Sequence, residues 1–218
     1  MPKELQQRIL SSIILIPLSF FFILKGSLLF NSFLLICFLV TSYEWYMMTK
    51  KKNYQLTGLI FLAFSFFSTY ALRNNFNDDS LSLFLIVLIT CISTDIGGYI
   101  FGNIFKGPKL TKISPKKTYA GMIGGYFLSI ININIYLNYS FLFDGSISKF
   151  TIKTLVIILL ISTISQIGDF VISYFKRLSK VKDTGKLIPG HGGLLDRVDG
   201  MIFAFPFSYV IAYFNILK

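Results

Sequence analysis

Seven long apolar runs constrain this chain more than any other feature of its sequence. Each is close to the ~20 residues that a helix needs to cross the core of a bilayer. Because lipid offers no hydrogen-bond partners to an open backbone, each run is expected to be helical. The sequence therefore predicts an all-α, polytopic integral membrane helix bundle with about seven transmembrane helices. The runs cover residues 9–25, 28–48, 56–72, 81–103, 119–138, 152–174 and 200–217.

The composition supports a membrane protein over a soluble one. Of the 218 residues, 54% are hydrophobic and only 14% are charged, whereas soluble domains carry about 25% charged residues. The segments between the runs are short, so we predict one membrane-embedded domain over 1–218. Within it, residues 1–90 are expected to anchor the chain, and residues 91–218 to supply the functional helices and cytoplasmic loops. The run at 9–25 is predicted to be a retained anchor, because no small-residue cleavage site follows it.

The basic residues are unevenly distributed over the connecting segments. If the N-terminus is cytoplasmic, the cytoplasmic segments hold 16 of the 21 Lys and Arg residues. This bias follows the positive-inside rule and predicts an N-in/C-out orientation. The net charge of +11 is then explained by topology and by attraction to anionic lipid, so no nucleic-acid partner is predicted.

Six of the ten acidic residues fall in the cytoplasmic half of a predicted span or in the last cytoplasmic loop. Carboxylates at membrane depth are costly and are functional candidates by default. The other four, in tails or loops, are expected to be solvated: Glu4, Asp78, Asp79 and Asp144. The six candidates are Glu44, Asp95, Asp169, Asp183, Asp196 and Asp199.

Three of these carboxylates are predicted to lie at one depth. In SQIGDFVISYFKR, Asp169, Ser173 and Lys176 are four and three residues apart and share a helix face. Asp196 and Asp199 are three apart at the start of the last run. Oxygen ligands beside lysines are typical of a Mg²⁺, Ca²⁺ or Mn²⁺ site that binds phosphate esters. A helix start with local ion pairs is the alternative that spacing alone leaves open.

A second polar cluster covers residues 91–125. Asp95 precedes Gly97 and Gly98, and the SPKKT element lies directly before the run at 119–138. Hydroxyl and lysine side chains beside a helix N-terminus can bind an anion. Helix packing would explain the glycines, and a positive-inside loop would explain the lysines but not the hydroxyls. The residues of interest in the element are Ser114, Lys116, Lys117 and Thr118.

The only histidine, His191, lies in the polar stretch KDTGKLIPGHGGLLDRVD. One histidine cannot form the usual two- or three-histidine zinc site. It is expected to hydrogen-bond within the loop, and its imidazole could also bind phosphate or shuttle a proton. The stretch has no GxxxxGK[ST] pattern, so it is not a P-loop.

The run SYFKRLSKVKDTGKLIPGHGGLLDRVD, from Ser173 to Asp199, resembles the signature of phosphatidate cytidylyltransferases of the bacterial type. It meets every position of S-x-x-K-R, K-D-x-G and P-G-H-G-G-x-x-D-R-x-D. TDIGGYIFG and ISPKKTYAG resemble segments upstream in that family. Two positions depart from it, since Ile172 and Ala120 stand where the family usually has Glu.

The resemblance implies that CTP and phosphatidate react at the cytoplasmic side of a bacterial inner membrane, giving CDP-diacylglycerol and pyrophosphate. It implies Mg²⁺ on Asp169, Asp196 and Asp199, and it allows a second cation such as K⁺ and a homodimer. It implies catalytic roles for Asp169, Lys176, Arg177, Lys182, Asp183, His191 and Arg197. It implies substrate binding by Asp95, Ser114, Lys116, Lys117, Thr118, Ser173, Gly190, Gly192 and Gly193.

Three other functions remain open at this point. A CTP-dependent polyprenol or lipid kinase would use similar groups, but the complete signature argues against it. An ion-coupled transporter would spread its carboxylates through the membrane depth, whereas only Asp95 is clearly deep. An inactive scaffold is suggested only by Ile172 and Ala120.

Overall fold

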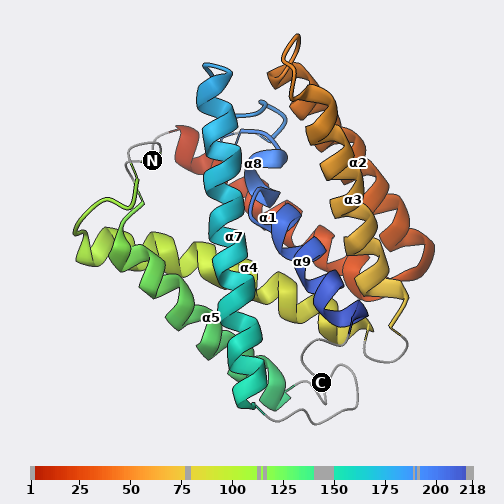
Figure 1. Cartoon of the computed structure of the whole chain (residues 1–218), viewed down its shortest axis with the longest axis vertical. Helices are drawn as coiled ribbons and strands as arrows, with labels where there is room; N and C mark the ends of the chain where they lie inside the picture. The colour runs from red at the N-terminus through yellow and green to blue at the C-terminus, as the bar shows by residue number, and fades with distance from the viewer. Residues whose placement is uncertain are drawn as a thin grey trace. The chain divides into compact units, whose positions relative to one another are not determined.

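The computed structural model describes residues 3–76, 80–111, 114, 117–139, 150–188, 190 and 192–214, with side chains from residue 13 onward. Within these ranges the regular structure is helical, apart from two isolated β-bridges (Figure 1). This confirms the predicted all-α class. The helices are α1 (Lys3–Lys25), α2 (Ser27–Met48), α3 (Gln55–Asn74), α4 (Ser80–Phe105), α5 (Tyr119–Tyr139), α7 (Ile152–Leu178), α8 (Leu195–Val198) and α9 (Met201–Tyr213).

The predicted apolar runs all contain a helix. In the described part of the chain, α2, α3, α4, α5 and α7 are long and apolar enough to cross a membrane. The first and last runs correspond to shorter apolar helices, Ile13–Lys25 and Met201–Tyr213. A multi-pass membrane protein is therefore confirmed, and the N-in/C-out orientation stays a prediction.

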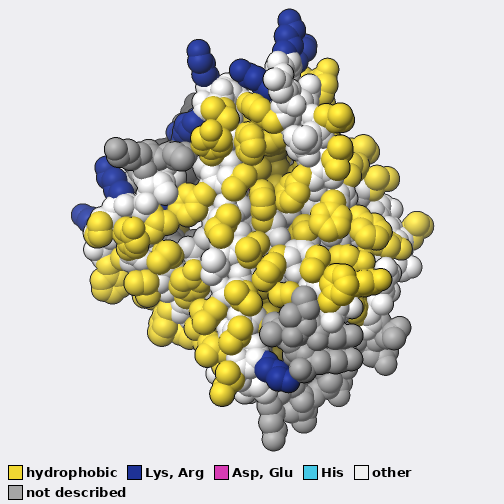
Figure 2. Space-filling view, viewed as in Figure 1, with side chains coloured by type: hydrophobic (Ala, Val, Ile, Leu, Met, Phe, Trp, Pro, Cys, Tyr) yellow, Lys and Arg dark blue, Asp and Glu magenta, His cyan; other side chains and the backbone are white. Residues whose placement is uncertain are grey.

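Large apolar side chains cover much of the visible face, and Lys and Arg lie mainly at its margins (Figure 2). Leu28 on α2, Tyr99 on α4 and Ile123 on α5 are 75%, 74% and 62% exposed. Exposed large apolar side chains are this numerous in few soluble proteins. Lipid is the environment in which such side chains carry no cost.

The chain forms two compact units. The first comprises residues 1–66 and 175–198, and the second comprises residues 67–174 and 199–218. Helices α3 and α7 contribute residues to both. The predicted division of the chain at residue 90 stays a prediction.

In the second unit, α4 and α5 pack closely along their length (Figure 1). A Cβ atom on Gly97 would collide with the carbonyl oxygen of Gly124 and lie 2.9 Å from the Cα of Gly125. On the other side, a Cβ on Gly124 would collide with the ring of Phe101. Small residues allow helix backbones to approach in membranes, where packing drives association. The packing interpretation of these glycines is thus supported.

Polar side chains join the helices of the second unit. Asn132 of α5 donates to Ser93 Oγ of α4 at 2.8 Å. Thr94 of α4 donates to Ser162 Oγ of α7 at 2.8 Å. Hydrogen bonds of this kind between membrane helices contribute about 0.6 kcal/mol on average. They therefore supplement the close packing rather than replace it.

In the first unit, Trp45 connects α2 to the segments around it. The residue is 3% exposed, and its Nε1 donates to the carbonyl oxygen of Gln55 at 3.0 Å. It packs edge-on against Phe175 at the end of α7, with ring centroids 5.3 Å apart. Tyr54 also contacts Phe175, at 4.9 Å between centroids. This aromatic cluster fixes the end of α2 beside the end of α7.

We expect Gly97→Ala to lower the free energy of unfolding by about 1–3 kcal/mol, because the added methyl overpacks the α4–α5 contact. Gly98→Ala is the matched control, since its Cβ would lie 3.7 Å from the nearest backbone atom of α5, the carbonyl oxygen of Gly121. The free energy of unfolding of both variants is measured in detergent. Equal stability of the two variants would contradict the packing assignment.

Candidate active site

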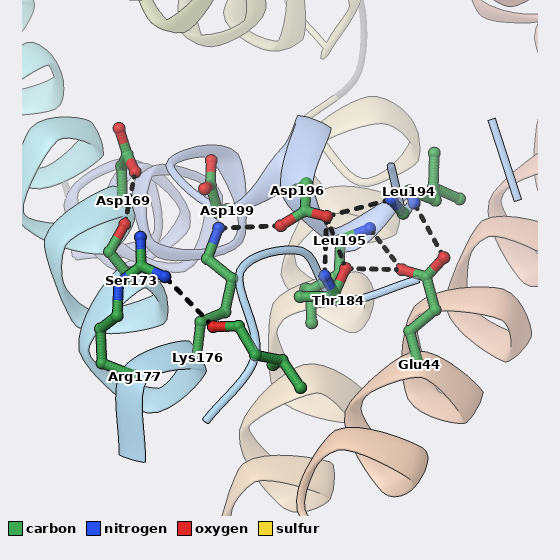
Figure 3. Close-up of polar contacts among 12 residues, drawn as sticks. Glu44, Asp169, Ser173, Lys176, Arg177, Thr184, Leu194, Leu195, Asp196 and Asp199 are labelled. Atoms are coloured by element: carbon green, nitrogen blue, oxygen red, sulfur yellow. Dashed lines mark hydrogen bonds and ion pairs between the residues drawn. The ribbon is translucent and has the colours of Figure 1, made fainter. Parts of the chain in front are cut away.

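The signature segment between α7 and α8 belongs to the first unit, and its polar contacts converge on Asp196 (Figure 3). Lys176 Nζ donates to Asp196 Oδ1 at 2.8 Å. Asp196 Oδ2 accepts the Thr184 backbone N–H at 2.8 Å, the Thr184 hydroxyl at 3.0 Å and the Gly193 N–H at 3.0 Å. Asp196 therefore ties the signature loop to the last turn of α7.

The pair of Lys176 and Asp196 is shielded from solvent. The lysine side chain is 11% exposed and the aspartate side chain 6%. A buried charge that loses its partner is strongly destabilising, because its desolvation is no longer offset. Lys176, which spacing placed on one helix face with Asp169 and Ser173, pairs with Asp196 in the structure.

Glu44 of α2 is a second anchor for the same loop (Figure 3). Its Oε1 accepts the Leu194 N–H at 2.9 Å, and its Oε2 accepts the Leu195 N–H at 2.8 Å. The Thr184 hydroxyl also lies 3.2 Å from Oε2. The predicted site omitted Glu44. The sequence did contain a signal for Glu44, because a charged residue within an apolar run had made it one of the six candidate carboxylates.

The glycines of the loop form a tight turn. Ile188 and Gly192 exchange two backbone hydrogen bonds, at 2.9 and 3.2 Å. Gly190 and Gly192 have φ angles of +76° and +89°, which side chains rarely tolerate. This geometry accounts for glycine at both positions without a ligand. Their predicted approach to phosphate stays a prediction.

The other cationic residues of the signature lie at the surface. Arg177, Lys182 and Arg197 are exposed, and so is Asp183. Arg177 donates to the carbonyl oxygen of Val181 at 3.3 Å, which closes the end of α7. Exposed cations can reach a soluble nucleotide, so their placement agrees with a role in binding phosphate.

In the second unit, Asp169 of α7 is the centre of a smaller cluster. Lys117 forms an ion pair with Asp169, and Ser173 Oγ donates to Asp169 Oδ1 at 3.3 Å. The Lys117 ammonium also lies 4.1 Å from the centre of the Phe170 ring. Residues from the SPKKT element and from α7 thus meet, as expected if they share one site.

The remaining predicted residues of the second unit have varied surroundings. Thr118 Oγ1 accepts the Gly121 N–H at 3.1 Å and so caps α5. The Ser114 N–H donates to Thr111 Oγ1 at 3.2 Å. Asp199 is 8% exposed and accepts the Gly200 N–H at 3.0 Å, whereas Asp95 is exposed on α4. The predicted residues Lys116 and His191 lie outside the described residues.

The three aspartates predicted to hold a metal divide between the units, with Asp196 in the first and Asp169 and Asp199 in the second. Among the described residues, no group of three or more His, Cys, Asp or Glu side chains forms a ready metal site. Carboxylate oxygens are the donors that Mg²⁺ takes. Asp169 and Asp199 fit that chemistry, whereas a cation at Asp196 would have to share its oxygens with four protein donors.

The family model described as "Cytidylyltransferase family" matches residues 6–78 and 57–215, which together span nearly the whole chain. The chain belongs to the cytidylyltransferase family. This confirms the resemblance that the signature residues suggested, and it makes the chain a member of a nucleotidyltransferase family.

Individual relatives agree with this membership. The chain is 36% identical over 221 residues to the phosphatidate cytidylyltransferase of Rickettsia felis, covering 96% of this chain and 93% of the relative. It is 36% identical over 214 residues to that of Rickettsia bellii, covering 96% and 91%. The phosphatidate cytidylyltransferase of Staphylococcus haemolyticus is 37% identical over 157 residues, covering 72% of this chain and 57% of the relative.

We expect Lys176→Met to lower the free energy of unfolding by about 3 kcal/mol, because it leaves the Asp196 carboxylate buried without its cation. Lys180→Met, which removes an exposed charge four residues away, is the control and should change stability by less than about 0.5 kcal/mol. Denaturation in detergent would be followed for both. If the two variants unfold alike, the buried pair is not stabilising.

Proposed function

We propose that this protein transfers the cytidylyl group of CTP to phosphatidate, giving CDP-diacylglycerol and pyrophosphate for phospholipid synthesis. The observation that carries the proposal is similarity over 96% of the chain to relatives named phosphatidate cytidylyltransferase. The complete signature from Ser173 to Asp199 supports it.

The proposed reaction needs charge neutralisation more than proton transfer. A phosphate oxygen of the lipid attacks the α-phosphorus of CTP, and pyrophosphate leaves. The attacking group is already an anion, so no strong general base is required. The enzyme must mainly hold the two anionic substrates, CTP and phosphatidate, with the attacking oxygen in line with the leaving pyrophosphate. Fixed cations stabilise this arrangement best where water is limited.

The chain's own cations are assigned to the phosphates. Arg177, Lys182 and Arg197 are exposed and are proposed to contact the triphosphate or the lipid phosphate, with Lys176 contributing from its pair with Asp196. Lys117, which lies beside Asp169 in the second unit, is proposed to contact phosphate together with the rest of the SPKKT element. The proposed roles of Asp183, His191, Asp95 and the loop glycines rest on the resemblance alone.

Asp169 and Asp199 of the second unit would hold Mg²⁺, which offsets phosphate charge when it is bound. The resemblance also assigns Asp196 to the metal, but the oxygens of Asp196 already accept from four protein donors. This assignment rests on the sequence motif and on oxygen-donor chemistry. A second cation such as K⁺ and a homodimer are compatible with it.

The site is proposed to lie at the cytoplasmic edge of a bacterial inner membrane. CTP comes from the cytoplasm and phosphatidate from the inner leaflet, so both substrates are available only at that boundary. The basic loop residues Lys50–Lys52 and the exposed cations of the signature would then share one side, as the positive-inside rule requires.

The reaction is tested with the purified protein, labelled CTP, phosphatidate and Mg²⁺. We expect labelled CDP-diacylglycerol and pyrophosphate, and no product when EDTA is present. Failure to form the lipid product under conditions where a known synthase is active would refute the proposal. Release of CDP with a phosphorylated lipid alcohol would instead identify a CTP-dependent lipid kinase.

The metal assignment has a separate test. Asp199→Asn should lower kcat about 100-fold or more and raise the Mg²⁺ concentration needed for half-maximal activity, because an amide binds the cation more weakly than a carboxylate. Asp144→Asn makes the same chemical change at an acid expected to be solvated, and it should leave both quantities unchanged. A fully active Asp199→Asn enzyme would remove Asp199 from the metal site while leaving the proposed reaction standing.

A further inference from the structure

Glu44 is a charged side chain in an apolar helix, yet it is almost completely shielded. The residue is 4% exposed, and its described partners are two backbone N–H groups and one hydroxyl. Burying a carboxylate is costly unless hydrogen bonds replace its water. Both of its oxygens are engaged with the signature loop, 140 to 151 residues further along the chain.

Two glycines of the signature make room for this carboxylate. A Cβ atom on Gly185 would lie 2.7 Å from Glu44 Oε1. A Cβ on Gly193 would lie 2.6 Å from Glu44 Oε2 and would also collide with the Thr184 hydroxyl. A Cβ atom at either position would therefore require the Glu44 carboxylate to move. Gly193, predicted to let backbone approach phosphate, therefore has a partner within the protein.

Thr184 links the two carboxylates that hold the loop. Its hydroxyl lies 3.2 Å from Glu44 Oε2 and 3.0 Å from Asp196 Oδ2, and its residue is 8% exposed. A hydroxyl has one proton and can rotate it toward either acceptor. Glu44 and Asp196 thus hold the start of α8 and the 183–185 segment together. Lys182 and Asp183, directly before Thr184, are exposed on the same loop.

We propose that Glu44 is a positioning residue for the cytidylyl transfer: its buried carboxylate holds the signature loop in the conformation that presents Lys182 and Asp183 to CTP. The inference rests on the proposed function. Glu44 itself contacts neither substrate and acts through Thr184 and the N–H groups of Leu194 and Leu195. A fixed loop holds the Lys182 ammonium in place before CTP binds. Such preorganised charge is the condition for electrostatic catalysis.

Glu44→Gln is the first test, because the amide keeps the size of the side chain but places an N–H₂ group against a backbone donor. We expect kcat to fall roughly 10- to 100-fold and the KM for CTP to rise, with the KM for phosphatidate unchanged. A role confined to stability would lower the active fraction and leave both KM values unchanged. Tyr43→Phe is the matched control, since Tyr43 is the neighbouring residue of α2 and is 64% exposed.

Hydrogen exchange provides a readout that is independent of activity. In Glu44→Gln, amides of the peptide covering 183–196 should exchange faster than in the wild type, with those of Leu194 and Leu195 most affected. Tyr43→Phe should leave them unchanged. Unaltered exchange in a folded Glu44→Gln protein would overturn the proposal.

A second pair of variants keeps the proposal testable if Glu44→Gln does not fold. Thr184→Ser retains the hydroxyl and should keep the wild-type KM for CTP, whereas Thr184→Val removes it and should raise that KM. Equal kinetics for the two variants would overturn the proposal. If the wild-type protein forms no CDP-diacylglycerol, the proposed function fails and the positioning role fails with it, while the exchange result still decides whether Glu44 holds the loop.

Discussion

The absence of water from the bilayer core is the constraint on which the rest of this structure depends. Backbone groups there must bond within their own segment, so the spans are helices. Side chains that carry charge must then either reach the polar edge or find partners inside the protein. In the first unit the buried charged side chains find partners inside the protein. Lys176 pairs with Asp196, and Glu44 accepts hydrogen bonds from the loop.

This constraint explains why the irregular loop between α7 and α8 makes so many hydrogen bonds to side chains. The segment between α7 and α8 has little regular structure of its own, so its backbone donors need side-chain acceptors. Asp196 and Glu44 together accept from Thr184, Gly193, Leu194 and Leu195. The loop can consequently expose Lys182 and Asp183 while its interior is held by two carboxylates. Rigid support for polar groups is what phosphate chemistry requires.

The two carboxylate clusters also differ in what surrounds them. Asp196 is nearly enclosed by protein donors, whereas Asp169, with 27% of its side chain exposed, meets Lys117 and a serine hydroxyl. A lysine beside an accessible carboxylate holds positive charge where the family resemblance implies a cation. Asp196, in contrast, has a clear architectural role already, so carboxylates that the resemblance assigns to one metal differ in what they do for the fold.

The sequence by itself determined the all-α class, the approximate spans and the family, and it supplied the candidate polar residues. These properties are local, because hydropathy, helical spacing and the signature from Ser173 to Asp199 are read over short stretches of chain. Only the tertiary structure revealed that Glu44 and Thr184 meet, since no periodicity relates residues 140 positions apart. It also decided why Gly185 and Gly193 are glycines. The resemblance implied substrate binding for Gly193, whereas a Cβ atom at either glycine would meet the carboxylate that α2 contributes.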